Sequence, residues 1–307
     1  MPQEHQGRSI CGNSRIAQNM RPLGDGGIML HAPAKINLNL LVGPLGSDGF
    51  HPIDSFVVKI TLYDALELRA RSDGRILLDC GHTDCGPPEK NLVTRAAKLL
   101  AAERDVCGVD IKLRKVIPAS AGLGGGSSDA AAALCGLNEL WGLGCDNAAL
   151  CSIAARLGSD VPLFLGPAAS RMTGRGECLA PLEVSDFAAV VVLGGYVCST
   201  AEVYGAYDRL GASASGQLDA SLLAVGPPSM WRDMLHNDLA QAAMDVCPQL
   251  AGLRDRIRAE VDVPVHVTGS GSAMFMLFDN AGQAATAIEG LDADLREMCV
   301  IAGLNPW

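Results

Sequence analysis

Four glycines and two serines fall within seven consecutive residues, Gly122-Leu123-Gly124-Gly125-Gly126-Ser127-Ser128. Glycines lack side chains, so the backbone of this segment can approach a ligand closely. A β-prone run at 109–117 precedes it and an alanine-rich run with helical spacing follows it, so the serines lie where a helix begins. The first N–H groups of a helix have no partners within it and attract anions, phosphate above all. The segment therefore predicts a site for the phosphates of a nucleotide.

The familiar phosphate-binding motifs do not fit this segment. A Walker A loop ends in Gly-Lys-Ser/Thr, and no lysine follows Gly126. The dinucleotide fingerprint and the protein-kinase glycine loop share the spacing Gly-x-Gly-x-x-Gly, whose last position here is Ser127 or Asp129. The ordinary alternative is a tight strand-to-helix connection with a good cap, although a simple cap needs one glycine rather than four.

Two ionisable residues stand in patterns that could serve a reaction. Lys35 lies in the alternating strand pattern 32–40, so it either faces solvent or points into a cleft, and Asn37 shares its strand face. Asp160 precedes Val161-Pro162 among apolar neighbours, which predicts an extended and partly buried aspartate. Taken alone, each has a plain alternative: a solvated lysine and a capping aspartate.

Six short motifs resemble the GHMP small-molecule kinases, in the same order along the chain. Three of them characterise the whole family: Ala32–Leu40, Pro118–Ala130 and Val267–Phe275. Three more resemble the branch that acts on a cytidine-diphosphate-linked methylerythritol in non-mevalonate isoprenoid biosynthesis: Asp48-Gly49-Phe50-His51, Leu157–Pro162 and His236-Asn237-Asp238-Leu239. The resemblance runs from about Met29 to Trp307. It implies an α+β, two-domain GHMP kinase fold with the active site in the interdomain cleft, and transfer from ATP with Mg²⁺ to a substrate hydroxyl, the 2-hydroxyl.

The resemblance also implies a role for each matched residue. Lys35 and Asp160 are the implied catalytic pair, in which Lys35 keeps Asp160 ionised as the general base for the hydroxyl. The implied ATP-binding residues are Asn91, Lys115, Pro118, Gly122, Leu123, Gly124, Gly125, Gly126, Ser127 and Ser128. The implied substrate-binding residues are Asn37, Phe50, His51, Tyr196, Thr200, Gly269, Ser270 and Gly271, with Phe50 stacking on the cytosine and His51 hydrogen-bonding to it. Asp129 would repel phosphate, so we expect it to face away as a cap, and the Mg²⁺ ligands stay open.

Two other functions have specific features for and against them. Another kinase of this fold, such as a homoserine or mevalonate kinase, would share the glycine segments, but Gly49-Phe50-His51 and Leu157–Pro162 argue against it. A nucleotide-binding regulatory protein without turnover would need neither Lys35 nor Asp160. ATP consumption across a panel of hydroxylated acceptors separates all three.

Elements that could position these residues follow from hydrophobic periodicity and caps. We expect strands at 28–42, 56–71, 76–80, 109–117, 188–193, 263–267, 274–278 and 298–301, and helices from Asn91 to Leu100 and at 127–141, 148–157, 200–210, 235–257 and 282–291. Strands and helices mix without regular alternation, which favours α+β.

Residues 1–27 lack periodicity and predict a disordered extension. A boundary near 165–168 fits the two-domain fold that the resemblance implies, with an ATP-binding domain, 28–166, and a substrate-side domain, 167–307.

Composition narrows the class of protein. The 307 residues exceed the usual size of one core, so two domains are expected. A net charge of −10 argues against nonspecific nucleic-acid binding, which needs a basic face. Eleven scattered cysteines without a Cys-x-x-Cys pair indicate reduced thiols in the cytoplasm. With neither a signal peptide nor an apolar run of membrane-spanning length, we expect no membrane partner, and a monomer or weak homodimer.

Overall fold

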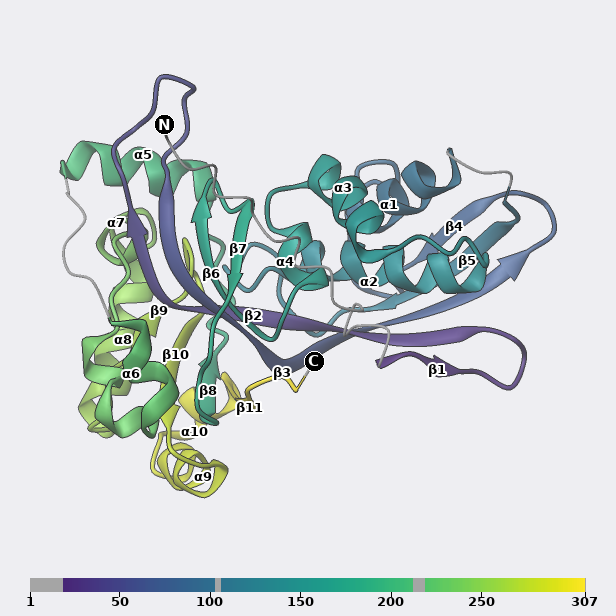
Figure 1. Cartoon of the computed structure of the whole chain (residues 1–307). Coiled ribbons are helices and arrows are strands. Elements are labelled where there is room, and N and C mark those ends of the chain that lie inside the picture. The colour runs from purple at the N-terminus through teal and green to yellow at the C-terminus, as the bar shows by residue number, and fades with distance from the viewer. Residues whose placement is uncertain (1–18, 103–105, 212–218, 307) are drawn as a thin grey trace.

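The computed structural model describes residues 19–102, 106–211 and 219–306, and contains two β-sheets with helices packed on them (Figure 1). In these residues, no helix has the length and apolar character needed to cross a membrane.

The first sheet is built around one long antiparallel hairpin. Strand β3 pairs with β2 from Ile53 to Leu68, with β6 over 53–58 and with β5 over 65–71. The strands of this sheet are β1 (Arg21–Pro22), β2 (Ile28–Val42), β3 (Ile53–Arg71), β4 (Ile76–Asp79), β5 (Gly108–Arg114), β6 (Ala169–Gly174) and β7 (Cys178–Pro181). Four helices belong with this sheet: α1 (Leu92–Ala101), α2 (Gly125–Leu140), α3 (Asn147–Leu157) and α4 (Val161–Leu165). Their apolar side chains share one core with β2, β3 and β5.

The second sheet is antiparallel, in the order β11-β8-β10-β9. Its strands are β8 (Ala188–Val192), β9 (His266–Val267), β10 (Met274–Phe278) and β11 (Cys299–Gly303). The helices in this half are α5 (Thr200–Leu210), α6 (Ala220–Val225), α7 (Ala240–Val246), α8 (Pro248–Glu260), α9 (Ala281–Glu289) and α10 (Ala293–Glu297), with short 3₁₀ turns η2 (Pro228–Met230) and η3 (Arg232–Met234).

The central strands of the second sheet are apolar on both faces because both faces are covered. Val190 and Val192 pack into a core with helices α5, α7 and α8. Ala189 and Val191 alternate with them and pack into a separate core against the first sheet. Ile36 of β2 belongs to that inter-sheet core, so its neighbours Lys35 and Asn37 face the other side of β2.

The largest differences from the expected elements have local causes. Residues 235–257 do not form one helix, because Pro248 starts α8 and lacks the N–H that would continue α7. The strand expected at 263–267 is confined to His266–Val267. The disordered extension expected at 1–27 reaches too far into the chain, because Asn19 is buried and β1 pairs with β2. Residues 1–18 lie outside the described part. The small, polar run at 211–216 predicts a loop, and it lies largely outside the described residues.

Strands β6 and β7 were not expected from the sequence. They carry mixed polar and apolar residues without a clear alternation, and they extend the first sheet beyond residue 167 through the pairing of β6 with β3. The second sheet begins with β8 at Ala188.

A buried cluster of three charges joins the first sheet to the glycine-rich segment. Lys115 Nζ contacts Asp64 Oδ2 and lies 2.8 Å from Asp129 Oδ2. The other oxygen of Asp64 accepts hydrogen bonds from the backbone N–H groups of Val116 (2.5 Å) and Ile117 (2.8 Å). Asp129 thus points to Lys115 and not into the cavity described below, so it faces away from the predicted phosphate site as expected, but the expectation that it caps the helix is wrong. Burial raises the pKa of Asp129 to about 7, against the opposing effect of Lys115.

Lys115→Met should lower the free energy of unfolding by about 3–5 kcal/mol, because it leaves two buried carboxylates without their cation. Lys112→Met, at an exposed position of the preceding strand β5, should change it by less than about 0.5 kcal/mol. Denaturant titration of both variants measures the difference. A Lys115→Met protein with unchanged unfolding but weakened ATP binding would instead make Lys115 a nucleotide contact.

Candidate active site

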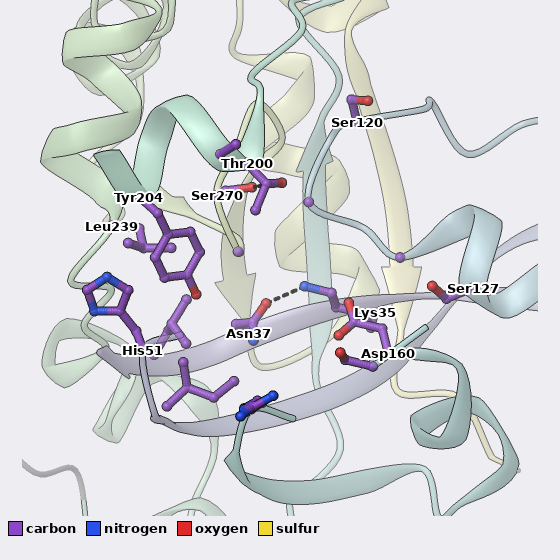
Figure 2. Close-up of a pocket in the computed structure, with 18 of the residues that line it drawn as sticks. Lys35, Asn37, His51, Ser120, Ser127, Asp160, Thr200, Tyr204, Leu239 and Ser270 are labelled. Carbon is purple, nitrogen blue, oxygen red and sulfur yellow. Dashed lines mark hydrogen bonds between the residues drawn. The ribbon is translucent and has the colours of Figure 1, made fainter. Parts of the chain in front are cut away.

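A cavity of about 970 Å³ is lined by residues from both halves of the chain (Figure 2). The first half contributes β2, the β2–β3 loop, the glycine-rich segment and the start of α4. The second half contributes α5 and the turn between β9 and β10. The cavity therefore lies where an interdomain active site is expected.

One end of the cavity is formed by the N-terminus of α2. Gly124 caps this helix in the left-handed conformation, with φ of 71°, and no side chain bonds to the helix end. The first N–H groups of α2 thus keep their capacity for an external acceptor, and Gly125, Gly126 and Ser127 line the cavity here. A helix end of this kind, rimmed by glycines, suits phosphate.

The backbone of the glycine-rich segment is in direct contact with the backbone of a second glycine turn, which lies between β9 and β10. Ala273 N donates to Ala121 O over 3.0 Å. A Cβ added to Gly122, at φ of +76°, would lie 2.3 Å from the carbonyl oxygen of Thr268, so no larger residue fits there. The second turn is therefore held directly against the glycine-rich segment.

Lys35 and Asn37 form a buried polar pair on the floor of the cavity. Lys35 Nζ donates to Asn37 Oδ1 over 2.5 Å (Figure 2). Asn37 Nδ2 in turn donates to Ser55 Oγ over 2.7 Å. Lys35 is 5% exposed. Burial lowers the pKa of its ammonium group, and the carboxylate of Asp160 partly offsets this. Lys35 N also donates to Leu123 O over 2.9 Å, which ties β2 to the glycine-rich segment.

Asp160 stands at the start of α4, facing the cavity beside Lys35 (Figure 2). Its backbone is helical, with φ of −85° and ψ of −11°, so the extended conformation expected before Val161-Pro162 is wrong: the residue is the N-cap, and the proline sits inside the first turn of α4. The far end of α4 is held by Lys59, whose Nζ donates to the carbonyls of Phe164 (3.3 Å) and Gly166 (2.8 Å).

The other end of the cavity is aromatic. Phe50 is 55% exposed, and the guanidinium of Arg175 lies 4.4 Å from its ring centre. His51 packs beside the ring of Tyr204, with centroids 5.4 Å apart. Burial raises the pKa of Tyr204 to about 12, so its hydroxyl keeps its proton at neutral pH. This end offers ring faces and hydrogen-bonding groups, as a planar base requires.

The structure brings most of the expected site residues together around this cavity. Those that line it are Lys35, Asn37, Phe50, His51, Pro118, Gly122, Gly124, Gly125, Gly126, Ser127, Asp160, Thr200, Gly269 and Ser270.

Six expected residues lie elsewhere. Asn91 caps α1 by accepting from Val93 N over 2.9 Å, although its neighbour Leu92 lines the cavity. Lys115 is held in the three-charge cluster described above. The other four contact the rest of the protein. Leu123 and Ser128 are fully buried, and the carbonyl of Tyr196 accepts a hydrogen bond from Ser272 Oγ. Gly271 lies near Ala243, Cys198 and Leu250.

Tyr204, Asp208 and Arg175 are among the lining residues that sequence reasoning missed. Tyr204 and Asp208 follow Thr200 at intervals of four on α5, so helical periodicity from Thr200 would have found both. Arg175 lies between β6 and β7, and without those strands nothing in the sequence directs it to the cavity.

The described residues contain no group of three or more His, Cys, Asp or Glu side chains that could hold a metal ion. Any Mg²⁺ at the phosphate end would thus depend on the nucleotide for most of its oxygen ligands, which is usual for this ion. Ser127 and Asp160 are the lining residues with oxygen donors near that end.

Comparisons with known proteins all indicate the same family. The GHMP kinases N terminal domain matches residues 91–166, and the GHMP kinases C terminal domain matches residues 220–297. A 4-diphosphocytidyl-2-C-methyl-D-erythritol kinase of a Nocardioides species is 40% identical, over 87% of this chain and 92% of the relative. The same-named kinase of Methylorubrum extorquens is 38% identical, over 83% and 91%.

Solved structures agree with this assignment. A crystal structure of 4-(cytidine 5′-diphospho)-2C-methyl-D-erythritol kinase matches with a TM-score of 0.75 and 32% identity, over 91% of this chain and all of that one. Homoserine kinase from Cytophaga hutchinsonii matches over 92% of this chain with a TM-score of 0.62 but 16% identity, which shows a shared fold alone. The expected α+β GHMP kinase fold is confirmed, and the chain belongs to the GHMP kinases, among the 4-diphosphocytidyl-2-C-methyl-D-erythritol kinases.

Proposed function

We propose that this chain transfers the γ-phosphoryl group of ATP to a hydroxyl, the 2-hydroxyl, of 4-(cytidine 5′-diphospho)-2-C-methyl-D-erythritol in non-mevalonate isoprenoid biosynthesis. The observation that carries the proposal is the order of groups along the cavity. The open end of α2 lies at one end, the aromatic groups lie at the other, and Lys35 and Asp160 lie between them (Figure 2).

The transfer step uses the charged pair in the middle of the cavity. The acceptor oxygen bonds to the γ-phosphorus, the bond to the β–γ bridging oxygen breaks, and the hydroxyl proton passes to the carboxylate of Asp160. Asp160 is placed for this because it lines the cavity beside Lys35, whose ammonium group can stabilise the negative charge that develops on the oxygen. Asn37 is the positioning residue, since it holds Lys35 Nζ from one side and is itself fixed by Ser55.

The phosphates of ATP are assigned to the first turn of α2. The backbone N–H groups there are fixed before the ligand arrives, so no reorganisation is needed to stabilise charge on the phosphates. Mg²⁺ bound to those phosphates would neutralise part of their charge, with Ser127 and Asp160 as the protein oxygens within the same part of the cavity.

Asp160→Asn should lower kcat by about 10²–10⁴, because the amide keeps the shape of the side chain but cannot accept the proton. Lys35→Met should cause a similar loss, and the double variant should be little worse than either single one, as for groups that act together. Single-turnover phosphoryl transfer measures each effect.

Nucleotide affinity shows whether a variant has lost only the transfer step or also its folded structure. All three should bind a non-hydrolysable ATP analogue within about threefold of the unmodified chain in calorimetry, because backbone groups of α2 supply that binding. Asp255→Asn, an exposed change on α8, is the control for both assays. Near-normal transfer by Asp160→Asn would remove Asp160 from the role of base.

Phe50→Ala should raise the KM for the cytidine-linked acceptor by removing a stacking contact worth about 1–3 kcal/mol, and leave the KM for ATP unchanged. Phe50→Leu keeps apolar area without a π face, so it should recover little of the loss. Steady-state kinetics with each substrate varied in turn tests both variants. A rise in the KM for ATP instead would assign Phe50 to the other ligand.

A further inference from the structure

Lys59 is a buried lysine in the middle of an apolar strand. It is 1% exposed and stands in the run Phe-Val-Val-Lys-Ile at 56–60 of β3. The backbone of Lys59 is fixed as well, because its N–H donates to Ala168 O over 2.8 Å and its carbonyl accepts from Asn305 N over 2.9 Å. Burial of an ammonium group is costly, and an apolar side chain would avoid that cost. A lysine at this position therefore indicates a role for the ammonium group.

The ammonium group of Lys59 is directed at the C-terminal end of α4. Its Nζ donates to the carbonyl oxygens of Gly166 over 2.8 Å and of Phe164 over 3.3 Å. The last carbonyls of a helix have no partners within it, and Phe164 is fully buried, so water does not replace the donor there. A positive charge also complements this end of the helix dipole. Lys59 thus supplies the donors that the end of α4 requires.

Helix α4 connects this anchor to Asp160. The helix has five residues and is about 7–8 Å long, and Asp160 is its N-cap, at the opposite end from Lys59. So short a helix contains few hydrogen bonds of its own, and contacts at its ends determine where it lies. A shift of the C-terminal end therefore moves the carboxylate at the N-terminal end.

The side of α4 packs against the phosphate end of the cavity. A Cβ added to Gly124, the N-cap of α2, would lie 2.8 Å from Cζ of Phe164 and 3.2 Å from Cγ of Lys35. The ring of Phe164 and the stem of Lys35 thus approach the same glycine. The position of α4 consequently sets Asp160 relative to both the buried lysine of the cavity and the N-terminus of α2.

We infer that Lys59 is a positioning residue for the transfer step: it holds the C-terminal end of α4 and so keeps the Asp160 carboxylate at the acceptor hydroxyl. This inference rests on the proposed function, in which Asp160 accepts the hydroxyl proton. Lys59 is not among the residues that line the cavity, so it touches neither substrate. Loss of its ammonium group should reduce kcat and leave the KM for each substrate in place.

A double-mutant cycle on the full chain tests the inference. Lys59→Met keeps most of the apolar stem and removes the ammonium group, so it should lower kcat about 10- to 100-fold, with both KM values within about threefold. In the Asp160→Asn background the same substitution should lower kcat by less than a further factor of about three, because the carboxylate that Lys59 positions is already lost. Single-turnover phosphoryl transfer measures each rate.

Three further variants separate positioning from a loss of stability. Leu295→Ala removes a buried side chain of α10 from the core of the second half, and should lower the denaturant midpoint with kcat retained. Lys98→Met is the same substitution at an exposed position of α1, and should change neither quantity. Lys59→Gln keeps an N–H donor on a side chain one atom shorter and should recover part of kcat. It also takes the place of Lys59→Met in the cycle if that variant does not fold.

The outcomes distinguish this inference from the proposed function. An unchanged kcat in Lys59→Met, an equal loss of kcat in Leu295→Ala at the same denaturant midpoint, or the same loss with and without the Asp160 carboxylate would overturn the role of Lys59 alone. Failure of the unmodified chain to phosphorylate the cytidine-linked acceptor would overturn the proposed function, and this inference with it. Normal transfer by Asp160→Asn would remove the group that Lys59 positions, so this inference would fall while the transfer reaction stands.

Discussion

The candidate site depends on the close approach of three backbone segments that are far apart in the sequence. Leu123 O accepts from Lys35 N, Ala121 O accepts from Ala273 N, and the hydroxyl of Thr268 accepts from Asn37 N. These contacts join β2, the glycine-rich segment and the β9–β10 turn into one unit. Because backbone atoms meet directly, the lysine ammonium, the open end of α2 and the second glycine turn keep a fixed geometry that no single side chain determines.

Positive groups held in fixed positions allow an acidic protein to bind an anion. The chain carries a net charge of −10, so its overall field repels nucleotide phosphates at long range. The local field at the site differs because Lys35 is buried there and the N–H groups of α2 point into the cavity. Two other lysines support the same region without facing it: Lys115 anchors the strand leading to α2, and Lys59 holds α4, which carries Asp160.

How much the sequence predicts depends on whether a residue acts through its neighbours in the chain or through distant ones. The limits of β2 and β10, the cap Asn91 and the start of a helix within the glycine-rich segment all follow from local patterns, and all agree with the structure. Lys115 and Asp129 could not be placed in this way. Both are ordinary polar residues in the sequence. Their cluster is completed by Asp64, more than fifty residues from either of them along the chain, which pairs with Lys115. Arg175 depends similarly on β6 and β7, which lack a readable period.

The two ends of the cavity are built from different parts of the polypeptide, and under the proposed function this separates transfer from recognition. Backbone groups form the phosphate end, so side-chain substitutions elsewhere leave it intact as long as the glycines remain. Side chains of the β2–β3 loop and of one stripe of α5 form the other end, where Phe50, His51 and Asp208 stand on exposed or half-exposed elements. Substitutions on that stripe can change which acceptor enters while leaving Lys35 and Asp160 in place. Homoserine kinase shares this fold at only 16% identity. Such divergence is compatible with this division, because the phosphate end constrains few side chains and the acceptor end is free to vary.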